Sequence, residues 1–115
     1  MSENCLFCKI IIGEISADII GNTEQAIAFH DINPQASTHV LIVPKKHIVS
    51  TSELNKDNIK YLSEMALLAN QIAKTEGIMG SGYRWVINTG IEGGQTVDHI
   101  HLHLIGGRQM LWPPG

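Results

Sequence analysis

Three histidines alternate with aliphatic residues near the C-terminal end of the chain, in the run His99, Ile100, His101, Leu102, His103, Leu104 and Ile105. A β-strand places successive side chains on opposite faces. The pattern therefore predicts a strand over 99–105, with the imidazoles on one face and the aliphatic side chains in the core. One polar residue on a strand face needs no function, but three histidines in strict alternation indicate a functional site.

The spacing of these histidines favours phosphoryl chemistry over a tri-histidine metal site. A strand rises about 3.3 Å per residue, so the Cα atoms of His99 and His103 lie roughly 13 Å apart. Metal–nitrogen bonds are only about 2 Å long, so the three imidazoles do not easily meet on one ion. A linear row suits attack by His101 on a phosphorus atom, while His99 and His103 contact phosphate oxygens and the leaving group.

A glycine-rich loop, 90–96, precedes the histidines and supports this interpretation. Its glycines allow backbone N–H groups to approach a phosphate closely, and Gln95 and Thr96 add side-chain donors. A glycine-rich turn between strands is by itself weak support, since it is usually only a turn. The chain has no Walker-type lysine pattern, so binding of a triphosphate with magnesium in the P-loop manner is not indicated.

Apolar periodicity and turn residues predict two helices and five strands. The helices are expected over 5–12, ending at Gly13, and over 55–76; the strands are expected over 17–21, 25–30, 39–43, 83–88 and 99–105. We expect the strands in meander order, with the long helix between the third and the fourth. This is an α+β fold with an antiparallel sheet. The 115 residues are enough for one domain, 1–115, with 109–115 as a C-terminal tail.

Composition narrows the partners and the compartment. Charged residues make up 17% and the pI is near 6.0, so there is no basic surface for nucleic acid. No apolar run approaches the roughly 20 residues that a membrane span needs, and the N-terminus lacks a signal-peptide pattern. We therefore expect a cytoplasmic protein with neither a nucleic-acid nor a membrane partner. In a reducing compartment Cys5 and Cys8 are expected as metal ligands or ordinary thiols rather than as a disulfide.

The spacing of the two cysteines leaves both of these alternatives open. Cys5 and Cys8 are three residues apart, so on a short helix their sulfur atoms share one face. With two histidines they would complete a closed tetrahedral set for zinc. However, one Cys-x-x-Cys followed by distant histidines matches no zinc-finger spacing, and two thiols without a ligand fit the sequence equally well.

The histidine run has the form of the histidine triad motif, and the chain resembles the HIT superfamily, most closely its Hint branch of nucleoside phosphoramidases. The resemblance covers nearly the whole chain. It includes the residues 29–36, the segment from His39 to His47 with its Pro-Lys-Lys-His end, Gly93-Gly94-Gln95, the triad, and 106–110. Two positions depart from the pattern: Asp98 stands where an aromatic residue is common, and Leu111 lies at a variable position of the tail.

The resemblance implies hydrolysis of purine nucleoside phosphoramidates or related nucleotidyl conjugates. A nucleotidyl-histidine intermediate would form on His101, with His103 as the partner of the scissile phosphate and His39 as a fourth histidine. A neutral imidazole is nucleophilic near pH 7, so no catalytic cofactor is needed. The residues similar to nucleotide contacts are Phe29, Asp31, Ile32, Asn88, Gly94, Gln95 and Thr96, with Asp31 on the ribose hydroxyls and Phe29 and Ile32 beside the base. The alternative is a nucleotide-binding or partner-binding regulatory module with little catalysis.

The resemblance also implies a homodimer and a structural zinc. A five-stranded sheet with one long helix leaves an exposed edge and an uncovered face, which a two-fold partner could protect. In the family two sheets join across the dimer, and the C-terminal segment, here 109–115, reaches toward the partner's site. Some members with an N-terminal Cys-x-x-Cys bind zinc, which here implies the ligand set Cys5, Cys8, His47 and His99.

Overall fold

The computed structural model describes residues 4–115, so the first three residues of the predicted domain lie outside the described part. Five antiparallel strands form one sheet in the order β1-β2-β3-β5-β4. The strands are β1 (Ile19–Asn22), β2 (Ala26–His30), β3 (Thr38–Pro44), β4 (Tyr83–Val86) and β5 (Leu102–Gly106); the helices are α1 (Leu6–Ile11) and α2 (Ile59–Thr75), with a 3-10 turn η1 (Thr51–Glu53). The α+β class, the number of strands and the two helices are confirmed.

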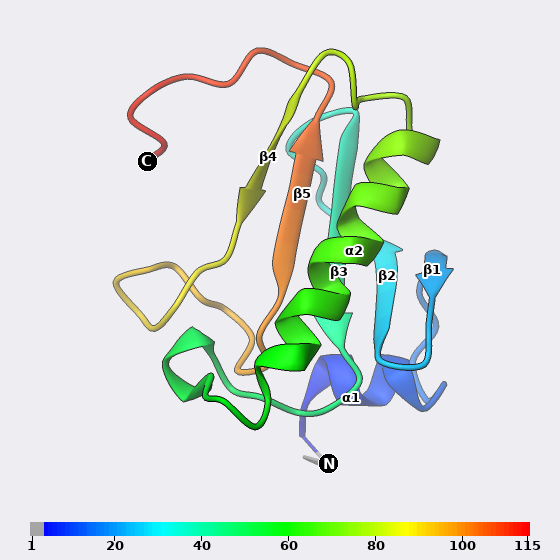
Figure 1. Ribbon diagram of the computed structural model, residues 1–115, viewed down its shortest axis with the longest axis vertical. Helices are drawn as coiled ribbons and strands as arrows, with labels where there is room; N and C mark the ends of the chain where they lie inside the picture. Colours follow the sequence, from blue (N-terminus) through cyan, green and yellow to red (C-terminus); the bar gives the residue numbers. More distant parts are fainter. Residues whose placement is uncertain (1–3) are drawn as a thin grey trace.

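The two helices cover opposite faces of the sheet, and successive side chains of each strand point to one helix and then to the other. In β2, Ala26 and Ala28 face α2, whereas Ile27 and Phe29 face α1. The first core is completed from α2, β3 and β5 by residues that include Met65, Leu68, Ala69, Ile72, Val40, Ile42, Leu102 and Leu104. Figure 1 shows α2 lying across the sheet and α1 below the lower ends of the strands. The alternating histidines belong to the α1 side of the sheet, since Leu102 and Leu104 occupy the α2 side.

The predicted meander order is wrong for the last two strands. β5 lies between β3 and β4, and β4 forms the edge of the sheet. Leu102 and Leu104 of β5 are completely buried, while Trp85 of β4 is 41% exposed. The more apolar strand therefore takes the central place beneath α2, and the half-polar strand takes the edge.

The histidine strand is shorter than predicted, because it begins at Leu102 rather than at His99. Leu102 pairs with Ile42 of β3, and the same register would place Ile100 opposite Pro44. Proline has no N–H to donate, so the ladder ends there. Instead, the Ile100 N–H donates to the Ile48 carbonyl, and the His99 N–H closes a turn onto the Val97 carbonyl. The aliphatic residues of the run are nevertheless buried as predicted, with Ile100 only 1% exposed.

The long helix also starts later than predicted, at Ile59. The Asn55 side chain accepts hydrogen bonds from the N–H groups of Asp57 and Asn58. This local turn competes with the helix for the same backbone donors. None of the helices formed by residues 4–115 has the length and apolar character that crossing a bilayer requires.

Candidate functional site

His101 is buried and has one ring nitrogen free for chemistry. Its Nδ1 lies 2.8 Å from the backbone oxygen of His99. A carbonyl oxygen only accepts, so Nδ1 carries the proton and Nε2 keeps the lone pair. Burial lowers the pKa of His101, while the hydrogen bond to the His99 carbonyl and the charge of Asp31 partly oppose this effect. The side chain is thus a neutral imidazole near pH 7, with a nucleophilic Nε2.

A second chain of hydrogen bonds orients His103. The backbone N–H of Gln35 donates to His39 Nδ1 over 3.1 Å, so the proton of His39 sits on Nε2. His39 Nε2 lies 2.9 Å from His103 Nδ1 and 3.4 Å from Asp31 Oδ2. His103 therefore accepts at Nδ1 and carries its own proton on Nε2. The rings of His101 and His103 are 5.1 Å apart, so a nucleophile and a hydrogen-bond donor lie side by side.

Two groups of metal-ligating side chains converge among residues 4–115, and only one suits a metal. The Cys-His cluster consists of Cys5, Cys8, His47 and His99; the other group is Asp31, His39 and His103. In the second group the Nε2 atom of His39 that faces its neighbours already carries a proton, because Gln35 donates to Nδ1. A neutral imidazole offers one lone pair, so this group forms a hydrogen-bonded relay and not a metal site.

The Cys-His cluster has the dimensions of a tetrahedral zinc site. His99 Nδ1 lies 3.3 Å from Cys5 Sγ, 3.6 Å from Cys8 Sγ and 3.1 Å from His47 Nδ1. Cys8 Sγ lies 3.3 Å from His47 Nδ1. Zinc bonds of about 2.1 Å to nitrogen and 2.3 Å to sulfur give tetrahedral edges of about 3.4 to 3.8 Å, close to these distances. His99 Nε2 donates to the Pro44 carbonyl over 2.8 Å, which leaves the Nδ1 lone pair directed into the cluster.

An apolar cavity of about 370 Å³ lies beside the histidines on the α1 face of the sheet. Its walls include Leu6, Phe7, Ile10, Phe29, Ile32 and Leu41, and Asp31 lies at its rim. The Phe7 ring lines this cavity and its centre is 5.0 Å from that of His101, so the cavity lies next to His101, with Phe7 between them. Asp31 accepts the Asn33 N–H at Oδ1, and its Oδ2 is directed toward His39. The cavity has the size and the apolar lining that a nucleobase requires.

The predicted phosphate-side residues lie in different surroundings. Gln95 Nε2 donates to the Val49 and Val97 carbonyls, and its Oε1 accepts from the Gly90 N–H, so its amide braces the loop backbone. Thr96 lines a separate cavity with Cys5, His47 and Asp98. The Asn88 side chain lies beside Gly94, whose φ of +82° favours glycine. Ile32, predicted as a wall of the base pocket, is fully exposed at the cavity rim.

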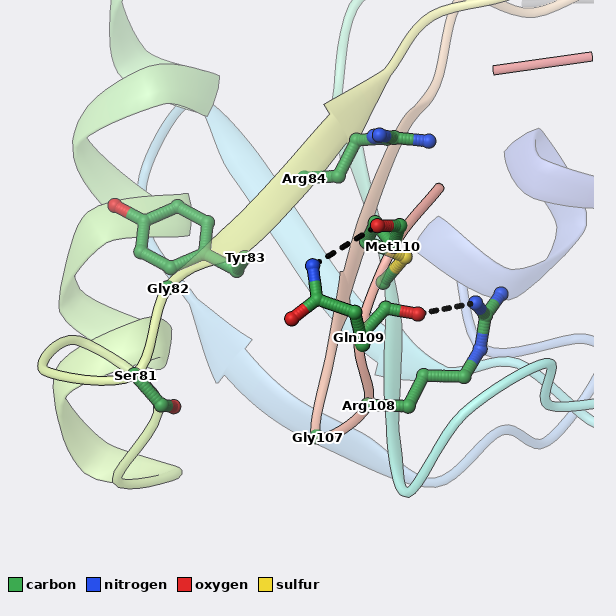
Figure 2. A pocket seen from close by; sticks show the side chains of 8 residues that line it. All are labelled: Ser81, Gly82, Tyr83, Arg84, Gly107, Arg108, Gln109 and Met110. Atoms are coloured by element: carbon green, nitrogen blue, oxygen red, sulfur yellow. Dashed lines mark hydrogen bonds between the residues drawn. The ribbon is translucent and has the colours of Figure 1, made fainter. Parts of the chain in front are cut away.

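A larger cavity, of about 510 Å³, is not the histidine site. It lies between the start of β4 and the segment after β5, and its lining contains no histidine: Ser81, Gly82, Tyr83, Arg84, Gly107, Arg108, Gln109 and Met110 (Figure 2). Both arginines already bind backbone carbonyls. Arg84 donates to Leu111, and Arg108 Nε donates to Gln35 over 2.9 Å. Arg108 therefore anchors the residue whose N–H orients His39, a connection that no sequence pattern reveals.

The half-buried His103 makes stability depend on pH. The pKa of His103 is lowered to about 4. Burial is the main cause, the neighbouring His101 and His39 add to the shift, and Asp31 opposes it. The folded-state pKa lies below the unfolded value of about 6.5, so this contribution to stability is complete above pH 6.5. It is lost as the pH falls toward 4, because only the unfolded chain binds the proton.

We therefore expect urea unfolding of the wild-type protein to show a steeper loss of free energy between pH 6.5 and 4.5 than unfolding of a His103→Asn variant. Both proteins keep the Cys-His cluster, so the difference in slope isolates His103. Equal slopes would show that His103 is not held neutral by the fold.

Comparison with known proteins agrees with the histidine site. The family model of the HIT domain matches residues 12–110. The chain is 46% identical over 112 residues to the 14 kDa zinc-binding protein of Zea mays, which covers 96% of this chain and 87% of the relative. The crystal structure of a HIT family hydrolase from Legionella pneumophila is 52% identical, with a TM-score of 0.95 over 97% of this chain and 100% of that one. A histidine triad nucleotide-binding protein from Candida albicans is 34% identical, with a TM-score of 0.84 over 93% and 77% of the two chains.

Proposed function

Because the chain belongs to the HIT family, we propose that it hydrolyses purine nucleoside phosphoramidates or related nucleotidyl conjugates through a nucleotidyl-histidine intermediate on His101. The observation that carries this proposal is the unprotonated Nε2 of His101 next to Phe7, whose ring lines the apolar cavity. The base would occupy the cavity that Phe7 and Phe29 line, and the ribose hydroxyls would donate to Asp31. A base bound in this way would put the phosphorus near the two histidine rings.

In the proposed reaction His101 Nε2 attacks the phosphorus, and the bond from phosphorus to the amine nitrogen breaks. The Nε2–H of His103 donates to a non-bridging oxygen, where negative charge grows during the attack. As it leaves, the amine nitrogen takes one proton from solvent. Water then attacks the phosphorus of the intermediate, restores that proton and releases the monophosphate, so each turnover consumes one water. The step needs no catalytic cofactor, since the nucleophile and the donor both come from the chain.

Mass spectrometry tests this function directly. We expect protein quenched during turnover of an adenosine phosphoramidate to gain the mass of one adenylyl group, and digestion to place that mass on the peptide that contains His101. Guanosine and uridine phosphoramidates measured in parallel give the base preference. Tight binding of AMP with no adduct and no amine release would instead favour the nucleotide-binding module.

We also propose that the Cys-His cluster holds one structural zinc. The donor set of two thiolates and two imidazoles, with edges of 3.1 to 3.6 Å, supports this ion. When bound, zinc would join α1 to the segments that follow β3 and precede β5. The 14 kDa zinc-binding protein of Zea mays, similar over most of its length, adds support.

A homodimer is proposed from the edge strand and the tail. β4 has a free edge, Trp85 is 41% exposed on it, and Leu111 and Trp112 of the tail are 75% and 84% exposed. We expect sedimentation at micromolar concentration to give twice the chain mass of 12.6 kDa. A Trp85→Glu substitution should yield a monomer, because it introduces a charge at the interface. The matched change Ile19→Glu on β1, the opposite edge, should leave the dimer intact; the reverse outcome would move the interface to β1.

A further inference from the structure

Phe7 contacts His101, His99 of the Cys-His cluster, and the apolar cavity. Its ring lies edge-on to His101 at 5.0 Å and to His99 at 5.8 Å between ring centres, with interplanar angles of 76° and 80°. It also packs against Phe29 at 5.6 Å and lines the apolar cavity. Only 3% of Phe7 is exposed. The ring thus covers the side of the His101 imidazole that lies toward α1.

The position of Phe7 depends on the two cysteines that flank it. Helix α1 has six residues, too few to be stable by itself in water. Cys5 is its N-cap and accepts the Cys8 N–H at Sγ, and both sulfur atoms lie within 3.6 Å of His99 Nδ1. A filled Cys-His cluster would therefore fix α1, and with it the ring of Phe7.

A second contact leads from the same cluster to His101. The His99 imidazole is held between the cluster and the Pro44 carbonyl, which fixes the residue. The backbone oxygen of His99 accepts the Nδ1–H of His101. Two groups therefore contact His101 away from Nε2. One is the carbonyl of His99, itself a member of the cluster, and the other is the ring of Phe7, which lies between Cys5 and Cys8 in the sequence.

We propose that Phe7 is a positioning residue for His101, and that its ring and the His99 carbonyl make the orientation of the nucleophile depend on the Cys-His cluster. This inference rests on the proposed function. It assigns Phe7 more than a place in the cavity wall: the ring keeps Nε2 directed at the phosphorus and keeps Nδ1–H on the His99 carbonyl. Rates of nucleophilic attack fall steeply when the reacting atoms are misplaced by even about 1 Å.

The Cys-His cluster is accessible from solvent. A cavity of about 420 Å³ reaches it from the surface, lined by Cys5, His47 and Asp98 among others. A chelator can therefore compete for the ion in the folded protein. Metal-free and zinc-loaded forms of the same chain can then be compared, which separates the effect of the cluster from the effect of any substitution.

The test compares Phe7→Leu with Ile27→Val in zinc-loaded protein. Leucine fills much of the space of Phe7 but removes the ring edge from His101. Ile27 is equally buried in the same core, but it does not line the cavity. With an adenosine phosphoramidate at saturation, we expect Phe7→Leu to lower kcat at least about tenfold and Ile27→Val to leave it within about twofold. A rise in KM with unchanged kcat would overturn the proposal and leave Phe7 as cavity wall only.

Imidazole NMR at one fixed pH gives a second measurement that needs no turnover. We expect His101 of the zinc-loaded wild type to show one tautomer, with the proton on Nδ1, and both Phe7→Leu and metal-free wild type to show a mixture. Zinc should restore the single tautomer in the wild type but not in Phe7→Leu. An unchanged spectrum in the metal-free protein would refute the dependence on the cluster. If no form releases amine, the proposed function fails, and the spectra still decide whether Phe7 positions His101.

Discussion

Replacing His101 by alanine is expected to abolish the nucleotidyl adduct and to lower kcat for a nucleoside phosphoramidate by about 10⁴-fold or more, while AMP still binds. Removing a nucleophile from a site whose groups act together costs nearly the whole covalent pathway. The cavity that would hold the nucleoside is lined chiefly by α1, β2 and the 31–32 turn, so its affinity does not depend on the His101 imidazole.

The control for this variant is Leu102→Val. Leu102 follows His101 directly, but its side chain is completely buried on the α2 side of the sheet. It reports any general disturbance of the strand, and we expect its kcat to stay within about twofold of wild type. Rapid-quench mass spectrometry measures the adduct, and calorimetric titration measures AMP affinity. An adduct that persists in His101→Ala would transfer the nucleophilic role to another residue.

The sequence predicts the face on which the histidines lie better than it predicts their strand. Alternation alone places Ile100, Leu102 and Leu104 in the core, and all three are buried. It does not reveal that residues 99–101 have left the ladder, since this depends on Pro44 lying opposite residue 100 in the register of β3 and β5. That departure lets the imidazole of His99 turn toward Cys5 and Cys8 while His101 and His103 stay together.

The roles of side-chain amides and backbone groups could not be predicted from residue type. Gln95 resembles a phosphate contact, yet its amide holds the backbone of three residues. The proton positions on His39 and His103 are set by the backbone N–H of Gln35, a group that every residue except proline carries. Phe7 stands in a Cys-Leu-Phe-Cys run in which only the cysteines attract attention. The contacts of Gln95 with Val49 and of Phe7 with His101 join segments far apart in the chain. The contact of Gln35 with His39 spans only four residues, but a backbone group makes it, so no residue type marks it in the sequence.

The Cys-His cluster leads to the second large effect, on stability. A Cys8→Ser variant is expected to bind no zinc and to lose at least about 3 kcal/mol, or roughly 12 °C in Tm for a domain of this size. The ion would tie α1 to His47 and His99, and without it the short helix has only its apolar contacts with the sheet.

Both cysteines of the chain are proposed ligands, so neither can serve as a control substitution for Cys8→Ser. Titration of the wild type with zinc and with a chelator supplies the control instead. An ion that binds only the folded protein raises Tm in proportion to the logarithm of its free concentration. We expect Tm of the wild type to rise with buffered free zinc and to fall with chelator toward the value of Cys8→Ser, while Tm of the variant stays constant. Serine keeps the helix and removes one thiolate, so a constant Tm assigns the response to this ligand. A wild-type Tm that does not respond to zinc or chelator, in protein that contains no zinc as purified, would return Cys5 and Cys8 to ordinary buried thiols.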